Sequence, residues 1–308
     1  MELLRKSRRL RAEVRARLTV PVVCAPMFLV SGPELIISAC RAGIAAGFPT
    51  LNARPAPSLD DWLAEVAAAC PRDGAPWAAN LIVHKTNQRL AEDLERVVRH
   101  RPPLVIASVG APDPVVAAIH DYGGLVFADV ASLRHAQKAA AAGADGLVLL
   151  TAGAGGHTGW LNPFAFVAEV RKFFGGIVAV AGCVTEGRQI AALELLGADL
   201  AYIGSPFIAT PESRAPSGHK QAVVAAGIDD IHLTDAVTGL KANFVRQSLL
   251  DEGIIDAAGT VIYDGALDVQ SWKTVWSSGQ GSGGVRRVRP VAEIVQDLAA
   301  EYEAAKTC

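Results

Sequence analysis

Short apolar segments alternate with longer stretches of helical composition from residue 20 to about residue 210. Each apolar segment is rich in Val, Ile, Leu or Ala and has the length of one buried strand. The predicted strands cover 20–25, 43–47, 77–82, 103–108, 124–129, 146–151, 176–181 and 200–204. Eight strands, each followed by a helix, predict a (β/α)8 TIM barrel in the α/β class. A doubly wound sheet is the alternative, but it more often has five or six strands and an early GxGxxG motif.

The helical stretches begin at Ser, Asp, Glu or Pro signals, as helices commonly do. They are predicted at 33–42, 59–69, 88–100, 114–120, 132–142, 163–174 and 186–196. The turns GADG at 143–146 and LGAD at 196–199 repeat the same helix-to-strand connection. Gly143 and Gly197 are expected to cap the C-termini of their helices, with Asp145 and Asp199 just before the next strand.

The alternation stops after Phe207. Residues 211–288 contain two charged helical pieces, 216–226 and 235–250, and then a looser glycine-containing stretch. This region is too long for a simple loop and predicts a small, mainly helical insertion subdomain after the eighth strand. Residues 1–210 and 289–308 would then form the barrel domain, whose last helix is predicted at 289–305. The basic segment 1–18 predicts an amphipathic surface helix, and a transit peptide or a nucleic-acid-binding arm is the alternative interpretation.

Composition and charge exclude several classes of protein. The chain is 51% hydrophobic and 19% charged, so it can bury a large core and is not disordered. Its 29 basic and 31 acidic residues give a net charge of −2, which offers no general attraction to nucleic acid or to an anionic membrane. Five widely spaced cysteines form no metal or disulfide pattern, and no apolar run is long enough for a membrane span. We expect a soluble cytoplasmic protein without a metal site, with a homodimer left open.

In a TIM barrel the active site lies at the carboxyl ends of the strands. Ala25, Pro26 and Met27 follow the first strand, Asn80 lies near the end of the third, and Asp129 ends the fifth. Ala181-Gly182-Cys183 follows the seventh strand and Gly204-Ser205 the eighth. Barrels commonly hold a phosphate at these last two strands, on backbone N–H groups that glycine leaves accessible. Either glycine alone could mark only a tight turn, but together they predict a phosphate-bearing ligand.

The segment AGAGGHTG, residues 152–159, places four glycines around His157. Glycines let a loop adopt positive φ and press against a flat ligand, and an imidazole suits proton transfer near neutral pH. The other histidines have no comparable surroundings. A solvated surface histidine is the alternative interpretation.

The segments APM, Asn80, AGGH, AGxxxxG and IGS, in this order, resemble the nitronate monooxygenase family, formerly called 2-nitropropane dioxygenases. The resemblance covers essentially the whole chain. It implies an FMN-dependent TIM barrel related to flavin-dependent enoyl-ACP reductases and NAD(P)H:quinone reductases. His157 matches the position of the family's catalytic base.

The resemblance also implies a set of cofactor contacts. These residues would surround FMN at its isoalloxazine ring, at the polar edge of the ring, at the phosphate and on the substrate side, and two of them lie where the chain returns from the insertion. They are Ala25, Pro26, Met27, Asn80, Asp129, Gly155, Gly156, Ala181, Gly182, Gly204, Ser205, Gln280 and Gly281. The chain departs from the family where AGC and GSPF replace AGG and GTRF, which removes an arginine beside the phosphate. Asp129 stands where a neutral or basic residue is common, so the charge at the flavin edge is in doubt.

The resulting first hypothesis is an FMN-dependent nitronate monooxygenase that oxidises alkyl nitronates or nitroalkanes with O2 and uses His157 as the base. The alternatives are an NAD(P)H:quinone reductase or an enoyl-ACP reductase-like flavoenzyme with NAD(P)H as the electron donor. A flavin-binding barrel without turnover, or a barrel for a phosphorylated sugar or nucleotide, belongs to another class.

Overall fold

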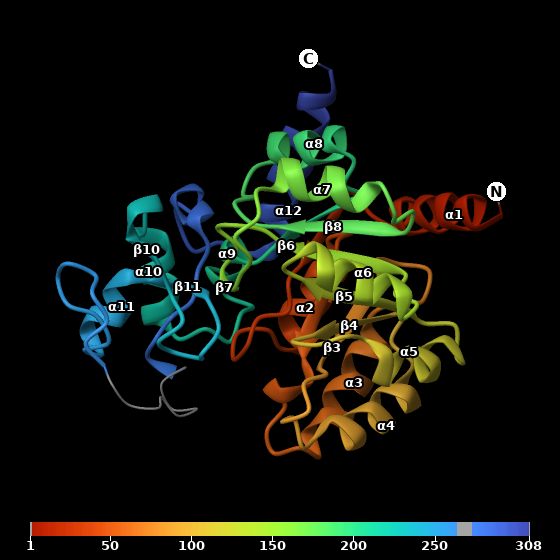
Figure 1. Cartoon of the computed structure of the whole chain (residues 1–308), viewed down its shortest axis with the longest axis horizontal. Coiled ribbons are helices and arrows are strands. Elements are labelled where there is room, and N and C mark those ends of the chain that lie inside the picture. The colour runs from red at the N-terminus through yellow and green to blue at the C-terminus, as the bar shows by residue number, and fades with distance from the viewer. Residues whose placement is uncertain (1, 264–272, 308) are drawn as a thin grey trace.

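Eight parallel strands close into a barrel in the computed structural model, which describes residues 2–263 and 273–307, with side chains from residue 9 onward (Figure 1). The strands are β1 Val22–Cys24, β2 Ala45–Pro49, β3 Trp77–Ile82, β4 Leu104–Ser108, β5 Leu125–Val130, β6 Gly146–Leu150, β8 Ile177–Ala181 and β9 Leu200–Ile203. Val23 of β1 is in register with Ala45 of β2 and with Tyr202 of β9, so β1 closes the barrel. All eight predicted strands are confirmed.

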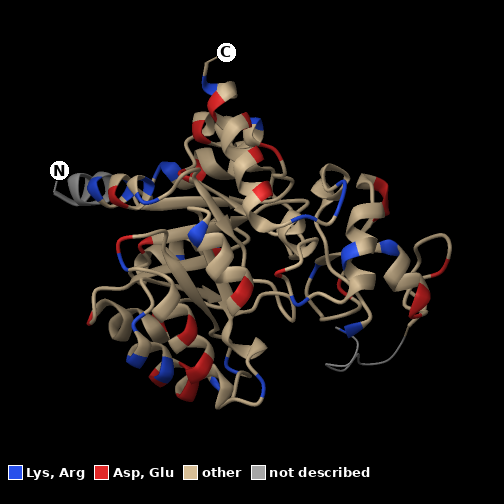
Figure 2. Cartoon of the chain, turned by 180° about the vertical axis from the view of Figure 1, so that it is seen from behind, with Lys and Arg blue, Asp and Glu red and all other residues tan. Residues whose placement is uncertain are grey.

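Helices cover the outside of the barrel, and the strands are almost entirely buried because both of their faces are packed. The helices are α1 Glu2–Ala16, α2 Pro33–Arg41, α3 Ser58–Ala69, α4 Leu90–His100, α5 Asp113–His120, α6 Leu133–Ala141, α7 Pro163–Arg171, α8 Gly187–Leu196 and α12 Val291–Lys306. In Figure 2 the Lys, Arg, Asp and Glu residues lie mainly on helices and loops and not on the barrel strands. No described helix has both the length and the apolar composition needed to cross a bilayer.

The repeated Gly-Ala-Asp turns behave as predicted. Gly143 and Gly197 have φ of +93° and +99°, the left-handed region in which glycine has no steric penalty. Each following aspartate binds back to the preceding strand: Asp145 accepts from the Val126 backbone N–H at 2.9 Å, and Asp199 accepts from that of Val178 at 2.8 Å. These hydrogen bonds therefore help to fix the register between neighbouring strands of the barrel.

The region after β9 contains α9 Ser205–Ile208, α10 Ser217–Ala225, β10 Ile231–Thr234, β11 Ala242–Val245 and α11 Arg246–Asp251, with 3-10 turns at Ile228–Asp230 and Gln280–Gly284. The helix predicted at 216–226 is confirmed by α10. The helix predicted at 235–250 is confirmed only over 246–250, which lie in α11. Before that point Gly239 turns the chain at φ +73° and β11 pairs with β10. Residues 264–272 of the predicted subdomain lie outside the described residues, and its boundaries at 211 and 288 stay a prediction.

A second, three-stranded sheet joins this region to the barrel. Its order is β10-β11-β7, where β7, Gly156–His157, lies in the glycine-rich loop after β6. The region also has its own small hydrophobic cluster, which includes Val237, Phe244, Leu249 and Ile254 and is separate from the barrel core. Gly156 and His157 therefore belong to a different sheet from the barrel strands that carry Asn80, Asp129 and Ala181.

Candidate functional site

A cavity of about 1080 Å³ lies at the carboxyl ends of the barrel strands and reaches the glycine-rich loop and the β10–β11 turn. This volume lies just above the range of small-molecule sites, roughly 300–1,000 Å³, and leaves room for a cofactor and a second ligand. All but one of the predicted site residues line it: Ala25, Pro26, Met27, Asn80, Asp129, Gly155, Gly156, His157, Ala181, Gly182, Gly204, Ser205 and Gly281.

Gln280 is the predicted residue that does not line the cavity. Its side chain is exposed, and its backbone N–H donates to the Gly153 carbonyl at 2.9 Å. Its Oε1 lies 3.9 Å from Sγ of Cys183. The structure thus places Gln280 behind the glycine-rich loop, where it links the end of the insertion to that loop.

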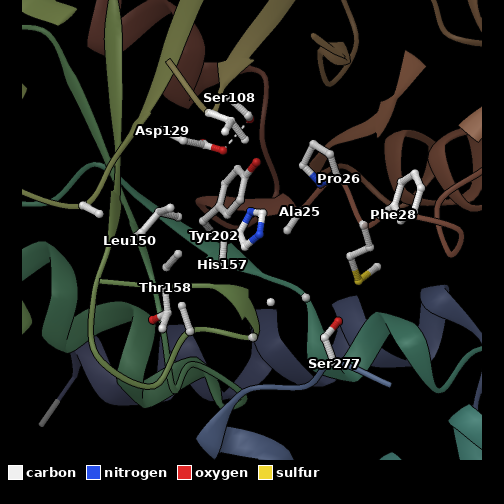
Figure 3. A pocket seen from close by; sticks show the side chains of 18 of the residues that line it. Ala25, Pro26, Phe28, Ser108, Asp129, Leu150, His157, Thr158, Tyr202 and Ser277 are labelled. Carbon is white, nitrogen blue, oxygen red and sulfur yellow. Dashed lines mark hydrogen bonds between the residues drawn. The ribbon is translucent and has the colours of Figure 1, made fainter. Parts of the chain in front are cut away.

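A chain of hydrogen bonds forms the polar floor of the cavity (Figure 3). Asn80 Nδ2 donates to Ser108 Oγ at 2.6 Å, and Ser108 Oγ donates to Asp129 Oδ2 at 2.5 Å. Asp129 Oδ1 is buried and has no hydrogen-bond partner among the described residues. Burial raises the pKa of Asp129 to about 6, and the Ser108 hydrogen bond opposes this rise.

Two residues of this floor were not predicted. Ser108 is the last residue of β4, and Tyr202 lies in β9 with its ring in the cavity. Burial and the nearby Asp129 raise the pKa of Tyr202. Both lie inside predicted strands, so the alternation of side chains between the faces of a strand was the signal that could have identified them.

The turn after β1 is fixed by the buried side chain of Asn52. Its Nδ2 donates to the Met27 carbonyl at 2.9 Å, and its Oδ1 accepts from the Leu29 backbone N–H at 2.9 Å. The Met27 backbone N–H donates to Ser31 Oγ at 3.0 Å. These bonds hold Ala25, Pro26 and Met27 as a rigid wall of the cavity.

The turns after β8 and β9 fit a phosphate. Gly182 has φ +129°, and a Cβ there would lie 2.5 Å from Thr151 Oγ1, so a side chain is excluded. Ser205 Oγ accepts from Ser278 Oγ and from the Gly279 backbone N–H, each at 3.0 Å. Ser205 also lines the cavity, so its hydroxyl can contact an anion bound there.

The polar floor of the cavity fits the isoalloxazine end of FMN. The polar edge of an isoalloxazine ring carries an N–H donor, which is what the unpartnered Oδ1 of Asp129 requires. Asn80 and Asp129 would hold that edge, and Gly182, Gly204 and Ser205 the phosphate. The donors and acceptors at both ends of the cavity therefore match the cofactor.

The insertion holds the glycine-rich loop by pairing with it. Residues Ala242 and Asn243 of β11 are in register with His157 and Gly156 of β7. Asn243 Nδ2 also donates to the Ala154 carbonyl at 2.8 Å. His157 is half-buried, and burial lowers its pKa. The imidazole is therefore neutral at pH 7 and able to accept a proton.

Comparison with known proteins shows the family of the chain. The family model for nitronate monooxygenases matches residues 35–301. The chain belongs to the nitronate monooxygenase family. A nitronate monooxygenase of Paraburkholderia phytofirmans is 27% identical over 271 residues, which is 74% of either chain.

Two curated relatives of this family member come from Mycobacterium tuberculosis. One is 34% identical over 52% of this chain and 43% of its own length. The other, a hydroxy-methyl-oxo-octahydroindene-carboxyl-CoA dehydrogenase, is 26% identical over 75% of this chain and 64% of its own length. This chain therefore matches less than two thirds of either relative's length.

Solved structures confirm the TIM-barrel fold of this nitronate monooxygenase family member. A nitroalkane oxidase from Streptomyces ansochromogenes superposes with a TM-score of 0.81 at 24% identity, covering 96% of this chain and 99% of that one. FabK from Thermotoga maritima superposes with a TM-score of 0.80 at 23% identity, covering 97% of either chain.

The mouth of the cavity is basic. Its lining includes Lys138 and His135 of α6, His84 of the β3–α4 loop and Lys241 beside the β10–β11 turn. Asp129, on the floor, is the single acid among the described lining residues. Although the chain as a whole has a net charge of −2, an anionic ligand meets positive charge where it enters.

Proposed function

We propose that this chain is an FMN-dependent nitronate monooxygenase that oxidises alkyl nitronates or nitroalkanes with O2. The observation that carries the proposal is the position of His157, a neutral half-buried imidazole in the cavity that also holds the phosphate turns and the polar floor. FMN, when bound, supplies the redox chemistry.

The residues of the chain would bind FMN, orient the substrate and remove a proton from it. Ala25, Pro26 and Met27 would lie along the flavin ring, with Asn80 and Asp129 at its polar edge. The phosphate would be held by Ala181, Gly182, Gly204 and Ser205, with Gly281 behind them. Gly155 and Gly156 would shape the substrate side. His157 would take a proton from the carbon next to the nitro group, or hold the nitronate that results.

The test compares a nitroalkane with its nitronate in O2-consumption assays of FMN-loaded enzyme. His157→Ala is expected to slow nitroalkane oxidation by about 10²- to 10⁴-fold, the usual contribution of a general base. Oxidation of the nitronate, which is already deprotonated, is expected to fall much less. His232→Ala, on β10 and outside the cavity lining, is the control. Equal losses on both substrates would contradict the base assignment.

A second candidate function is NAD(P)H-dependent reduction of a quinone or an enoyl thioester. The basic mouth favours it, because nicotinamide dinucleotides and CoA esters both carry phosphates, and one relative is named a CoA-ester dehydrogenase. Anaerobic titration with NADH and NADPH separates the two functions. Rapid bleaching of the flavin without nitronate oxidation would favour the reductase.

Location and assembly are further parts of the proposal. Cys24, Cys40 and Cys70 are buried and unpaired, and Cys183 is exposed and unpaired, which supports a reducing cytoplasm. Trp160 and Phe164 are 77% and 68% exposed, and a homodimer would cover such side chains. Gel filtration of the wild type and of Trp160→Glu tests this proposal. If the chain forms a homodimer through this surface, the wild type should elute as a larger particle than the variant.

A further inference from the structure

We propose that Tyr202 of β9 is a cofactor-binding residue whose hydroxyl donates a hydrogen bond to a carbonyl oxygen at the polar edge of the isoalloxazine ring. The identity of the ligand, FMN, rests on the proposed function. The need for a further donor, and the choice of Tyr202 as that donor, rest on the hydrogen bonds of the cavity floor.

The other side-chain donors of the floor are already used within the protein. Asn80 Nδ2 carries two protons, which it donates to the Ile106 carbonyl at 2.9 Å and to Ser108 Oγ at 2.6 Å. Above its pKa of about 6, Asp129 is ionised, and its Oδ2 accepts the hydroxyl proton of Ser108. Since an amide nitrogen has two protons and a hydroxyl has one, neither Asn80 nor Ser108 can donate to a ligand.

The floor atoms that remain for a ligand are acceptors. Asp129 Oδ1 and Asn80 Oδ1 receive no hydrogen bond from any described residue. The polar edge of an isoalloxazine ring has one N–H between two carbonyl oxygens. Asp129 can accept from the N–H, but a carbonyl oxygen needs a donor, and a buried acceptor without one costs free energy. The carbonyl oxygens therefore require a donor other than Asn80 and Ser108.

Tyr202 is in position to be this donor. It lines the cavity and is 9% exposed, and in Figure 3 its hydroxyl points toward Asp129 and Ser108. The hydroxyl has no hydrogen-bond partner among the described residues. Burial and the charge of Asp129 raise the pKa of Tyr202, so the phenol keeps its proton. A ligand in the cavity can then accept that proton.

The neighbouring strands direct the ring into the cavity. Tyr202 is in register with Val23 of β1 and with Ala181 of β8. Residues in register on neighbouring strands project to the same side of a sheet, and Ala181 lines the cavity. The methyl group of Ala181 fills little of the space beside the phenol. The ring can therefore project from β9 toward Asp129 of β5.

The test titrates the flavin-free full chain with FMN and with riboflavin, which has the same ring but no phosphate. Tyr202→Phe keeps the aromatic ring and removes only the hydroxyl. Loss of one hydrogen bond predicts that both flavins bind about 5-fold more weakly. Ser205→Ala should weaken the binding of FMN and leave that of riboflavin as in wild type. A loss in Tyr202→Phe that is confined to FMN would place the missing contact at the phosphate and contradict the proposal.

The ring carbonyls provide a second measurement. A hydrogen bond moves the 13C signal of a carbonyl downfield, so FMN labelled at both ring carbonyls is bound to wild type and to Tyr202→Phe. We expect one of the two signals to move upfield in the variant and the other to stay. A hydroxyl that only packed against its neighbours would leave both signals unchanged.

Tyr122→Phe is the matched control. The Tyr122 hydroxyl donates to the Pro102 carbonyl at 2.9 Å, and Tyr122 is not among the described residues that line the cavity. Both flavin affinities and both carbonyl signals should stay as in wild type.

Two carbonyl signals at the positions of FMN in an aprotic solvent, measured on wild type, overturn the proposal, and this result needs no variant to fold. Unchanged carbonyl signals in Tyr202→Phe also overturn it, whether or not the affinity falls. An upfield shift in Tyr202→Phe together with absence of nitronate oxidation in wild type refutes the proposed function and leaves the Tyr202 assignment standing.

Discussion

Replacing Asp129 by Asn should make the FMN-free protein more stable at neutral pH. The carboxyl group is buried on the cavity floor, its Oδ2 accepts from Ser108, and its Oδ1 has no described partner. In the folded protein the Asp129 carboxylate is less hydrated than in the unfolded chain, so its ionisation lowers the free energy of unfolding. Asn has nearly the same shape and cannot ionise, so the substitution removes this cost and little else.

The magnitude follows from the pKa, which rises from 3.8 to about 6 on folding. Below pH 3.8 the carboxyl is protonated in both states, and the free energy of unfolding has its full value. Between these two pKa values the unfolded chain loses its proton first, so stability falls as the pH rises. Above pH 6 the loss is complete at about 3 kcal/mol.

The assay is urea denaturation of the flavin-free protein at pH 4 and at pH 7.5. We expect the unfolding free energy of Asp129→Asn, relative to wild type, to rise by about 2.5 kcal/mol between these pH values, because part of the full loss has already occurred at pH 4. Asp121→Asn, at an exposed residue after α5, controls for loss of a carboxylate. Bound FMN should shrink the difference, since an N–H donor at Oδ1 favours the carboxylate.

Parallel stability curves for wild type and Asp129→Asn across this pH range would refute the reasoning. They would mean that the floor stays hydrated and that the carboxylate is not penalised by burial. The same result would remove the argument that an N–H of the cofactor is needed at Oδ1.

Two further substitutions test the loops around the cavity. Gly159→Ala would place a Cβ 2.2 Å from the Leu150 carbonyl oxygen, and should destabilise the protein by about 1–3 kcal/mol in thermal or urea unfolding, whereas Gly283→Ala, with 3.9 Å to its nearest neighbour, should not. Equal stability of the two variants would show that the 152–159 loop can move away. Ser205→Ala removes the acceptor of the Gly279 N–H and a donor for the phosphate, and should weaken FMN binding about 10-fold or more in a fluorescence titration. Unchanged affinity would place the phosphate elsewhere.

The barrel could be read from the sequence because each βα unit is a local pattern. β3 was predicted to the residue, and the other strands differ from the structure only by a few end residues. The site residues at the strand ends could be predicted from the barrel alone, because its geometry brings the carboxyl ends of all strands together regardless of the loop conformations. Ser108 and Tyr202 could have been found in the same way, by asking which strand residues face inward.

The insertion could not be read in this way. The segment 235–250 has the charged and apolar composition of a helix, but its β11 strand pairs with β7, which lies some 80 residues earlier in the chain. Pairing between segments so distant leaves no local signal. The contact of Thr238 Oγ1 with His157 Nε2, at 3.2 Å, depends on that pairing, and the position of Gln280 behind the loop depends on the same return of the chain.

The two-sheet construction has a consequence for the dynamics of the site. The phosphate turns and the polar floor belong to the large barrel core, whereas His157 is held by short strands over a small separate cluster. Small units open more readily than large ones, so the hairpin should exchange its amide hydrogens faster than the barrel strands. Each such opening would take His157 away from the phosphate turns and the polar floor, which keep their positions. Under the proposed function, proton transfer would stop while the hairpin is open, and FMN would remain bound.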